Sequence, residues 1–248
     1  MVRNIKLTIS YDGTNYHGWQ TQLNVPTIQE TIENAIEVVT KQKVDLTGSG
    51  RTDRGVHALG QVANFISDNK IPEDKIKIAL NANLPKDIRI IDSKEVTLNF
   101  NSRFDAHDKT YMYQIYNHRV FDPFLRNYSY FVPQILDFEK MKQASKLIIG
   151  THDFKGFMSA GSDIKTTVRT IYDVQLEQNG PLIKLYVTGS GFLYNMVRII
   201  AGTLIDIGKN LNDISCITNA LNTLDRTVLG QTAAPEGLFL KEVKYNIE

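Results

Sequence analysis

The sequence has a single cysteine, Cys216, in 248 residues, which excludes an internal disulfide and a cluster of thiolate metal ligands. It also has no apolar run that approaches the roughly 18 residues of a membrane span. No apolar signal core precedes Asp12 near the N-terminus. We therefore expect a cytoplasmic protein without a membrane partner.

An excess of charge of either sign is missing as well, because 28 Lys and Arg residues face 27 Asp and Glu residues. No global basic field marks the chain as a nucleic-acid binder, so any RNA-binding surface must concentrate its positive charge locally. Hydrophobic residues make up 42% of the chain, enough for a substantial core in one large domain or two ordinary ones.

The common signatures of cofactor and metal chemistry are missing too. Gly48 and Gly50 form a Gly-x-Gly after a predicted strand, but Asp53 stands where the dinucleotide-binding fingerprint needs its third glycine, and no P-loop lysine follows. No Gly-x-Ser-x-Gly nucleophile elbow is present. The histidines are dispersed, and for His152 beside Asp153 a loop hydrogen bond is a simpler interpretation than a ligand pair. We expect no cofactor and no metal.

Alternating apolar and polar side chains predict that the chain opens with a strand over residues 5 to 11. Residues 27 to 30, Thr-Ile-Gln-Glu, have the capping-box form and begin a predicted helix at about 27 to 41. Further strands are expected at 44–47, 61–67, 87–92, 109–117, 166–177, 182–188 and 238–245. Further helices are expected at 73–82, 137–149 with Asp137 as N-cap, 192–207 and 213–223.

Runs of strands interrupted by single helices predict an α+β fold with mostly antiparallel sheet flanked by helices. Residues 46 to 50, Leu-Thr-Gly-Ser-Gly, are echoed by residues 187 to 191, Val-Thr-Gly-Ser-Gly, and each segment ends a predicted strand. We therefore predict two similar half-domains, an N-terminal half at 1–103 and a C-terminal half at 104–248.

The sharpest local feature is the glycine-rich segment from Gly48 to Ala58, in which Asp53 lies between Arg51 and Arg54. The glycines permit close approach of a ligand. Two neighbouring cations favour an ionised carboxylate, in opposition to any burial. A solvated turn with surface ion pairs is an equally good interpretation from composition alone.

Two other segments combine features of binding sites. Residues 103 to 113 interleave basic and aromatic side chains, a combination that suits unpaired RNA, although a packed strand with Tyr111, Tyr113 and Ile115 on one face is the plainer interpretation. Residues 191 to 204 form a nearly apolar predicted helix with Arg198 as the only charge. A buried arginine needs a partner, for which Asp53 and an unidentified structural carboxylate both qualify.

At these residues the sequence resembles the TruA family of tRNA pseudouridine synthases over almost its whole length. Five segments in the expected order carry the resemblance: Tyr11-Asp12-Gly13-Thr14-Asn15-Tyr16-His17-Gly18-Trp19-Gln20, Gly50-Arg51-Thr52-Asp53-Arg54-Gly55-Val56-His57-Ala58, Lys109-Thr110-Tyr111-Met112-Tyr113, Gly191-Phe192-Leu193 with Met196-Val197-Arg198, and Ala234-Pro235-Glu236-Gly237-Leu238.

The resemblance implies a cofactor-free isomerase of the pseudouridine synthase fold, with an active-site cleft between its halves. It implies a homodimer that converts uridines 38, 39 and 40 in the anticodon stem-loop of tRNA. Asp53 is then the catalytic aspartate, Tyr111 stacks on the target uracil, Arg51 helps to displace the base, and Arg198 pairs with Asp53. Arg54, next to Asp53, is a further candidate for substrate binding.

An ionised Asp53 has two open routes: attack on C1′ of the ribose, as in a retaining glycosidase, or removal of a proton from C2′. The sequence does not choose between them. A noncatalytic protein that binds structured RNA, and a nucleotide-binding enzyme, are the alternatives from other functional classes.

Overall fold

The computed structural model describes residues 2–161 and 164–246. The chain divides into two compact units, one made of Met1–His107 with Phe239–Glu248 and the other of Asp108–Leu238. None of the helices within the described ranges has the length and apolar character that crossing a bilayer requires.

The first unit is built around β1 (Arg3–Tyr11), which pairs antiparallel with both β3 (His57–Ser67) and β4 (Ile88–Val96). The alternating side chains Ile5, Leu7 and Ile9 of β1 are fully buried, as their period of two predicts. The short β2 (Thr47–Gly48) pairs antiparallel with β3, and β10 (Leu238–Tyr245) runs parallel to β3 at Phe239 and Leu240.

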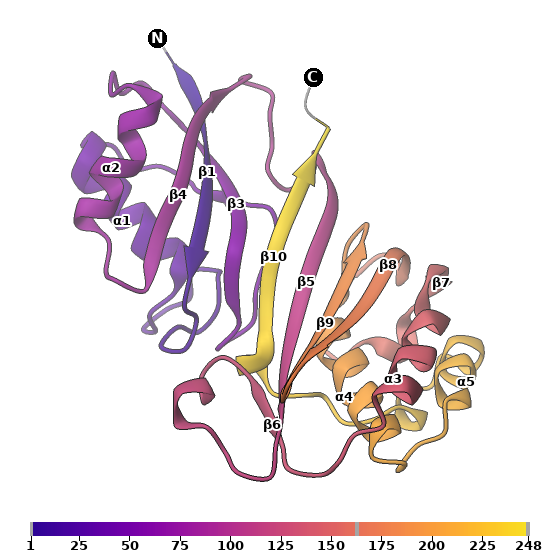
Figure 1. The fold of residues 1–248 in the computed structure, drawn as a ribbon. Coiled ribbons are helices and arrows are strands. Elements are labelled where there is room, and N and C mark those ends of the chain that lie inside the picture. The colour runs from indigo at the N-terminus through magenta and orange to yellow at the C-terminus, as the bar shows by residue number, and fades with distance from the viewer. Residues whose placement is uncertain (1, 162–163, 247–248) are drawn as a thin grey trace. The chain divides into compact units, whose positions relative to one another are not determined.

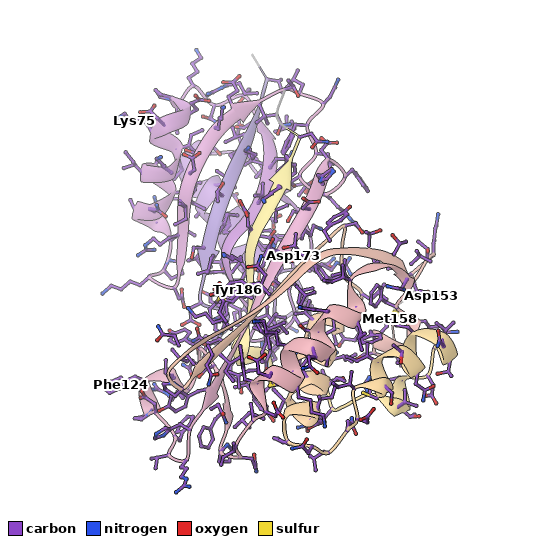
Figure 2. The ribbon with its side chains drawn as sticks, turned by 45° about the vertical axis from the view of Figure 1, so that its right-hand side comes forward. Lys75, Phe124, Asp153, Met158, Asp173 and Tyr186 are labelled. Carbon is purple, nitrogen blue, oxygen red and sulfur yellow. The ribbon has the colours of Figure 1, made fainter. Side chains whose placement is uncertain are left out.

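Two helices, α1 (Ile28–Thr40) and α2 (Glu73–Asn83), cover one face of these strands (Figure 1). Lys75, labelled in Figure 2, lies on the outer side of α2. The buried stripe of α1 matches the predicted one, but the capping box is wrong. Thr27 is fully buried, its side chain makes no cap hydrogen bond, and its carbonyl accepts instead from the amide and hydroxyl of Thr31. Packing rather than capping therefore fixes the start of α1.

The second unit holds an antiparallel sheet in the order β5-β9-β8-β7. Its strands are β5 (Ala106–Asn117), which enters from the first unit, β6 (Tyr130–Val132), which runs parallel to β5, β7 (Gly150–Asp153), β8 (Val168–Asn179) and β9 (Leu182–Gly189). Its helices are α3 (Phe138–Ser145), α4 (Met196–Gly208) and α5 (Ser215–Thr223). Single 3₁₀ turns lie at Pro123–Leu125, Lys146–Ile148, Lys155–Phe157, Arg226–Val228 and Pro235–Gly237.

Both units confirm the α+β class with mostly antiparallel sheet flanked by helices. Some boundaries differ from those expected. The strand predicted at 44–47 is reduced to Thr47–Gly48, and the helix predicted at 137–149 changes to a 3₁₀ turn after Ser145. Asp137 is the predicted N-cap and accepts from the amide of Lys140. Helix α4 begins at Met196 rather than 192, because Asn195 has a left-handed backbone with φ 61°.

Candidate active site

In the first unit, the loop between β2 and β3 carries Arg51, Asp53 and Arg54 and is held by the segment that follows β1. The Trp19 amide donates to the Thr52 carbonyl at 3.0 Å, and the Gly55 amide donates to the Tyr16 carbonyl at 3.3 Å. These two bonds bracket Asp53 from both sides, so its backbone is fixed although it lies in a loop.

A buried hydroxyl pair fixes the residue just before Asp53. The Tyr11 hydroxyl and Thr52 Oγ1 are 2.7 Å apart, and both residues are almost completely buried. Burial raises the pKa of the Tyr11 phenol well above its ordinary value, so the hydroxyl stays protonated and able to hydrogen-bond. Thr52 is therefore tethered through both its carbonyl and its side chain.

Two glycines allow the backbones of the two segments to touch. A side chain at Gly18, which has φ 91°, would place its Cβ 2.5 Å from the Thr52 carbonyl oxygen. A Cβ at Gly13 would meet the Val56 carbonyl, on the other side of Asp53. Only glycine fits such close backbone approaches, which explains the two glycines of the Tyr11–Gln20 motif.

The base of the loop is tied to β3 by buried polar groups. Ser49 donates its hydroxyl to Gln61 Oε1 at 2.6 Å, and Gln61 Nε2 donates to the Gly50 carbonyl at 3.0 Å. His57, which is 1% exposed, accepts from the Gly13 amide at Nδ1 and has Asp12 Oδ1 3.2 Å away. Hydrogen bonds therefore hold both ends of the loop.

Asp53 itself is half-buried and closes a tight turn, its carbonyl accepting from the Val56 amide at 3.1 Å. The side chains of Arg51 and Arg54 are exposed, and neither forms an ion pair with a carboxylate within residues 2–161 and 164–246. Solvent screens exposed charges, so these arginines act on Asp53 more weakly than a direct pair would. Their guanidinium groups are instead available to an anionic ligand.

In the second unit, Tyr111 is on β5, opposite Val187 of β9. Its ring is half-buried and meets the edge of Phe192 at 5.1 Å between centroids and 82° between planes. Tyr113 and Ile115, on the same face, are fully buried core residues. The packed-strand interpretation is confirmed for those two, while Tyr111 keeps part of its ring accessible.

Arg198 lies in the first turn of α4 and is aimed by fixed acceptors. Its Nε donates to the Ala233 carbonyl at 2.7 Å, and one terminal nitrogen donates to Asn195 Oδ1 at 2.8 Å. The Ala233 amide returns a bond to the Arg198 carbonyl at 3.1 Å. The left-handed Asn195, which delays the start of α4, therefore also orients this guanidinium.

The segment Ala234–Leu238 packs against β5, the strand that carries Tyr111. The buried Tyr113 donates its hydroxyl to the Ala234 carbonyl at 2.8 Å, and a Cβ at Gly237 would meet the Gln114 carbonyl. Burial raises the pKa of Tyr113 well above its usual range, which keeps this donor protonated. This supporting role, like those of Tyr11, Thr52 and Phe192, was not predicted from the sequence, although all four residues lie in the motifs.

His152 makes the loop hydrogen bond that its sequence favoured, with Nε2 3.1 Å from the Ile149 carbonyl. Asp153 accepts from the Lys155 amide and the Thr167 hydroxyl. In the part of the chain that the structure describes, no three His, Cys, Asp or Glu side chains form a group able to hold a metal ion.

A family model described as tRNA pseudouridine synthase matches residues 7–105 and 144–246, which include Asp53 and Arg198. The chain belongs to this family. The synthase is 50% identical over 248 residues to "tRNA pseudouridine synthase A 2" of Clostridium tetani, covering 99% of this chain and 100% of the relative. It is 51% identical to "tRNA pseudouridine synthase A" of Acetivibrio thermocellus, covering 98% and 100%. These relatives confirm the resemblance to the TruA family.

A solved archaeal box H/ACA sRNP Nop10-Cbf5 complex aligns with the synthase at a TM-score of 0.38 and 11% identity, covering 81% of this chain and 44% of that one. The overall likeness is low, and the assignment to the family depends on the sequence matches alone.

Proposed function

We propose that this synthase isomerises uridine to pseudouridine at positions 38, 39 and 40 in the anticodon stem-loop of tRNAs, with Asp53 as its catalytic residue. The observation that supports the proposal most is the loop of Asp53: a half-buried carboxylate fixed on both sides, in a chain half identical to curated tRNA pseudouridine synthases over their full length.

The reaction breaks the bond between N1 and C1′, turns the uracil, and joins C5 to C1′. C5 loses a proton and N1 gains one, so the atoms and electrons balance and the reaction requires no oxidant or reductant. Asp53 stabilises the sugar as positive charge develops on it, either by attack on C1′ or by taking the proton from C2′. Both routes need the carboxylate ionised.

A stacked base cannot reach a carboxylate, so the target uridine must be flipped out of the RNA at a cost of a few kcal/mol. In the proposal, the accessible part of the Tyr111 ring stacks on the flipped uracil and offsets that cost. Arg51, exposed beside Asp53, occupies the space that the base leaves, and Arg54 binds a phosphate. Arg198 pairs with Asp53 and keeps it ionised.

We also propose that the synthase acts as a homodimer in the cytoplasm. Three apolar side chains of the long connection after β5 are exposed: Phe121, Phe124 and Ile135 are 43%, 85% and 83% exposed. Phe124, the most exposed of the three, is labelled in Figure 2. We propose that a second copy of the chain covers these side chains.

The proposal is tested by incubating the purified protein with an unmodified tRNA transcript that has uridines at 38 to 40. Carbodiimide labelling followed by primer extension then maps pseudouridine. We expect stops at those positions and none when they are cytidines. A protein that binds the transcript but leaves every uridine unchanged would instead be a noncatalytic RNA-binding protein.

A further inference from the structure

The turn before β5 presents an arginine and a phenylalanine together to solvent. Arg103 is exposed and Phe104 is 77% exposed, and the guanidinium carbon of Arg103 lies 5.6 Å from the centroid of the Phe104 ring. This is the distance of a cation–π contact. One face of the ring is thus used by the protein, while most of the ring remains accessible.

The turn is anchored firmly beneath these two side chains. Ser102 is fully buried, its amide donates to Asn64 Oδ1 at 2.9 Å, and its hydroxyl donates to the Thr47 carbonyl. Its own carbonyl accepts from the Tyr245 hydroxyl at 2.7 Å. Three strands, β2, β3 and β10, therefore hold one residue, and β2 leads directly into the loop of Asp53.

Side-chain caps fix the exposed part of the turn as well. Asn101 Oδ1 accepts from the amides of both Arg103 and Phe104, at 2.9 and 3.2 Å. Asp105 accepts from the Asn101 amide at 2.8 Å and donates its own amide to the Asn101 carbonyl. The backbone of Arg103 and Phe104 is therefore fixed before any ligand arrives, which lowers the entropic cost of binding.

Folding does not account for the position of Phe104, because a ring that is 77% exposed buries little apolar surface. The residues of the turn beside it, Asn101, Arg103 and Asp105, are polar, which suits a nucleotide better than an apolar protein surface. A single rigid aromatic ring beside one cation is the combination that binds an unpaired base and its phosphate.

We propose that Arg103 and Phe104 form a stacking platform for an unpaired nucleotide of the RNA substrate, distinct from the target uridine. A base lies on the face of Phe104 away from Arg103, and the guanidinium contacts the phosphate of that nucleotide. The inference rests on the proposed function, because it takes tRNA as the ligand. It adds a second point of contact that sets which RNA loops the enzyme accepts.

The test compares the affinity of Phe104 variants for two RNA probes at one fixed salt concentration, by filter binding. The probes are an anticodon-arm hairpin with its single-stranded loop and a blunt duplex of the same stem. Phe104→Ala weakens hairpin binding by about 5- to 150-fold, the range expected for one lost stack, and leaves duplex binding unchanged. Phe104→Trp keeps the hairpin affinity, and Phe104→Leu loses most of it.

Arg103→Gln lowers the slope of log Kd against log salt concentration for the hairpin by about 0.7, the value for one phosphate contact on a single strand. Ile78→Ala is the matched control, because Ile78 is 59% exposed on α2, outside the turn. It leaves both affinities as in the wild type. The melting temperatures of all variants stay within about 2 °C of the wild type, because exposed substitutions change folding little.

Equal hairpin affinity of Phe104→Ala and the wild type would overturn the platform, and so would a large drop in melting temperature or a change in oligomeric mass. Pseudouridine formation by the wild type is measured on the same hairpin. A wild type that binds through Phe104 but forms no pseudouridine contradicts the proposed function and supports the platform. A wild type that forms pseudouridine without needing Phe104 overturns the platform alone.

Discussion

At the scale of single residues, Tyr111 and Tyr113 on β5 show how a tyrosine at the proposed site differs from one in the core. Tyr111 meets the edge of Phe192 and keeps part of its ring accessible, whereas Tyr113, two residues along, is fully buried and bonded to Ala234. Neighbouring tyrosines on one strand thus have different tasks, one supporting the fold and one proposed to contact substrate.

Replacing Tyr111 separates stacking from hydroxyl chemistry. Tyr111→Phe keeps the ring and its edge contact with Phe192, so we expect it to retain most of the rate of pseudouridine formation. Tyr111→Ala loses the stacking interaction, worth about 1–3 kcal/mol, so its rate of pseudouridine formation should be at least 10-fold below that of Tyr111→Phe. Single-turnover rates on a tRNA transcript measure both. Equal losses would show that the hydroxyl matters, as an acceptor of the proton from C5.

At the scale of elements, the loop of Asp53 depends on its neighbour after β1. Gly18 has φ 91°, and a Cβ added there would lie only 2.5 Å from the Thr52 carbonyl oxygen. Gly18→Ala must therefore displace the residue next to Asp53, and we expect kcat to fall by about 100-fold, the cost of a misplacement of about 1 Å. Stability should fall by about 1–3 kcal/mol.

A matched control for this change is Gly180→Ala. Gly180 also has a positive φ, of 57°, but nothing lies within 4 Å of its added Cβ. We expect a smaller loss of stability and an unchanged kcat, measured by thermal melting and by steady-state rates. A Gly18→Ala enzyme with normal kcat would show that the contact with Thr52 does not position Asp53.

Some features of these elements could be predicted from the sequence, and others could not. The strand at 5–11, the stripe of α1 and the cap at Asp137 were predictable because they depend on local periodicity and local hydrogen bonds. The parallel pairing of β10 with β3, and the tether between Tyr11 and Thr52, join residues far apart in the chain. No local pattern encodes such pairings.

The residues of the candidate site also include some that the sequence predicted and some that it did not. Asp53 and Arg51 were recognisable from the glycine-rich motif, because composition marks an unusual loop. Phe192 and Asn195 were not singled out, although Phe192 lies in a motif and Asn195 lies just before Met196-Val197-Arg198. Their roles against Tyr111 and Arg198 depend on the edge contact between two rings and on a left-handed backbone, which appear only in three dimensions.

At the scale of the whole molecule, the exposed apolar side chains on the connection after β5 lead us to expect that two copies of the chain associate. Light scattering should give a mass near twice the 28.1 kDa of the chain, because covering Phe124 and Ile135 removes apolar surface from water. Phe124→Glu with Ile135→Glu should shift the mass to that of the single chain, while Ile78→Glu on α2 should not. A wild-type mass of one chain at micromolar concentration would contradict the homodimer.

The catalytic role of Asp53 is tested most directly by Asp53→Asn, which keeps the shape of the side chain and removes its charge. Asp45→Asn, eight residues earlier and exposed, is the matched control. We expect Asp53→Asn to bind the tRNA transcript within a few-fold of wild-type affinity and to form no pseudouridine, while Asp45→Asn is fully active. Pseudouridine formed by Asp53→Asn at the wild-type rate would contradict the assignment of Asp53 as the catalytic residue.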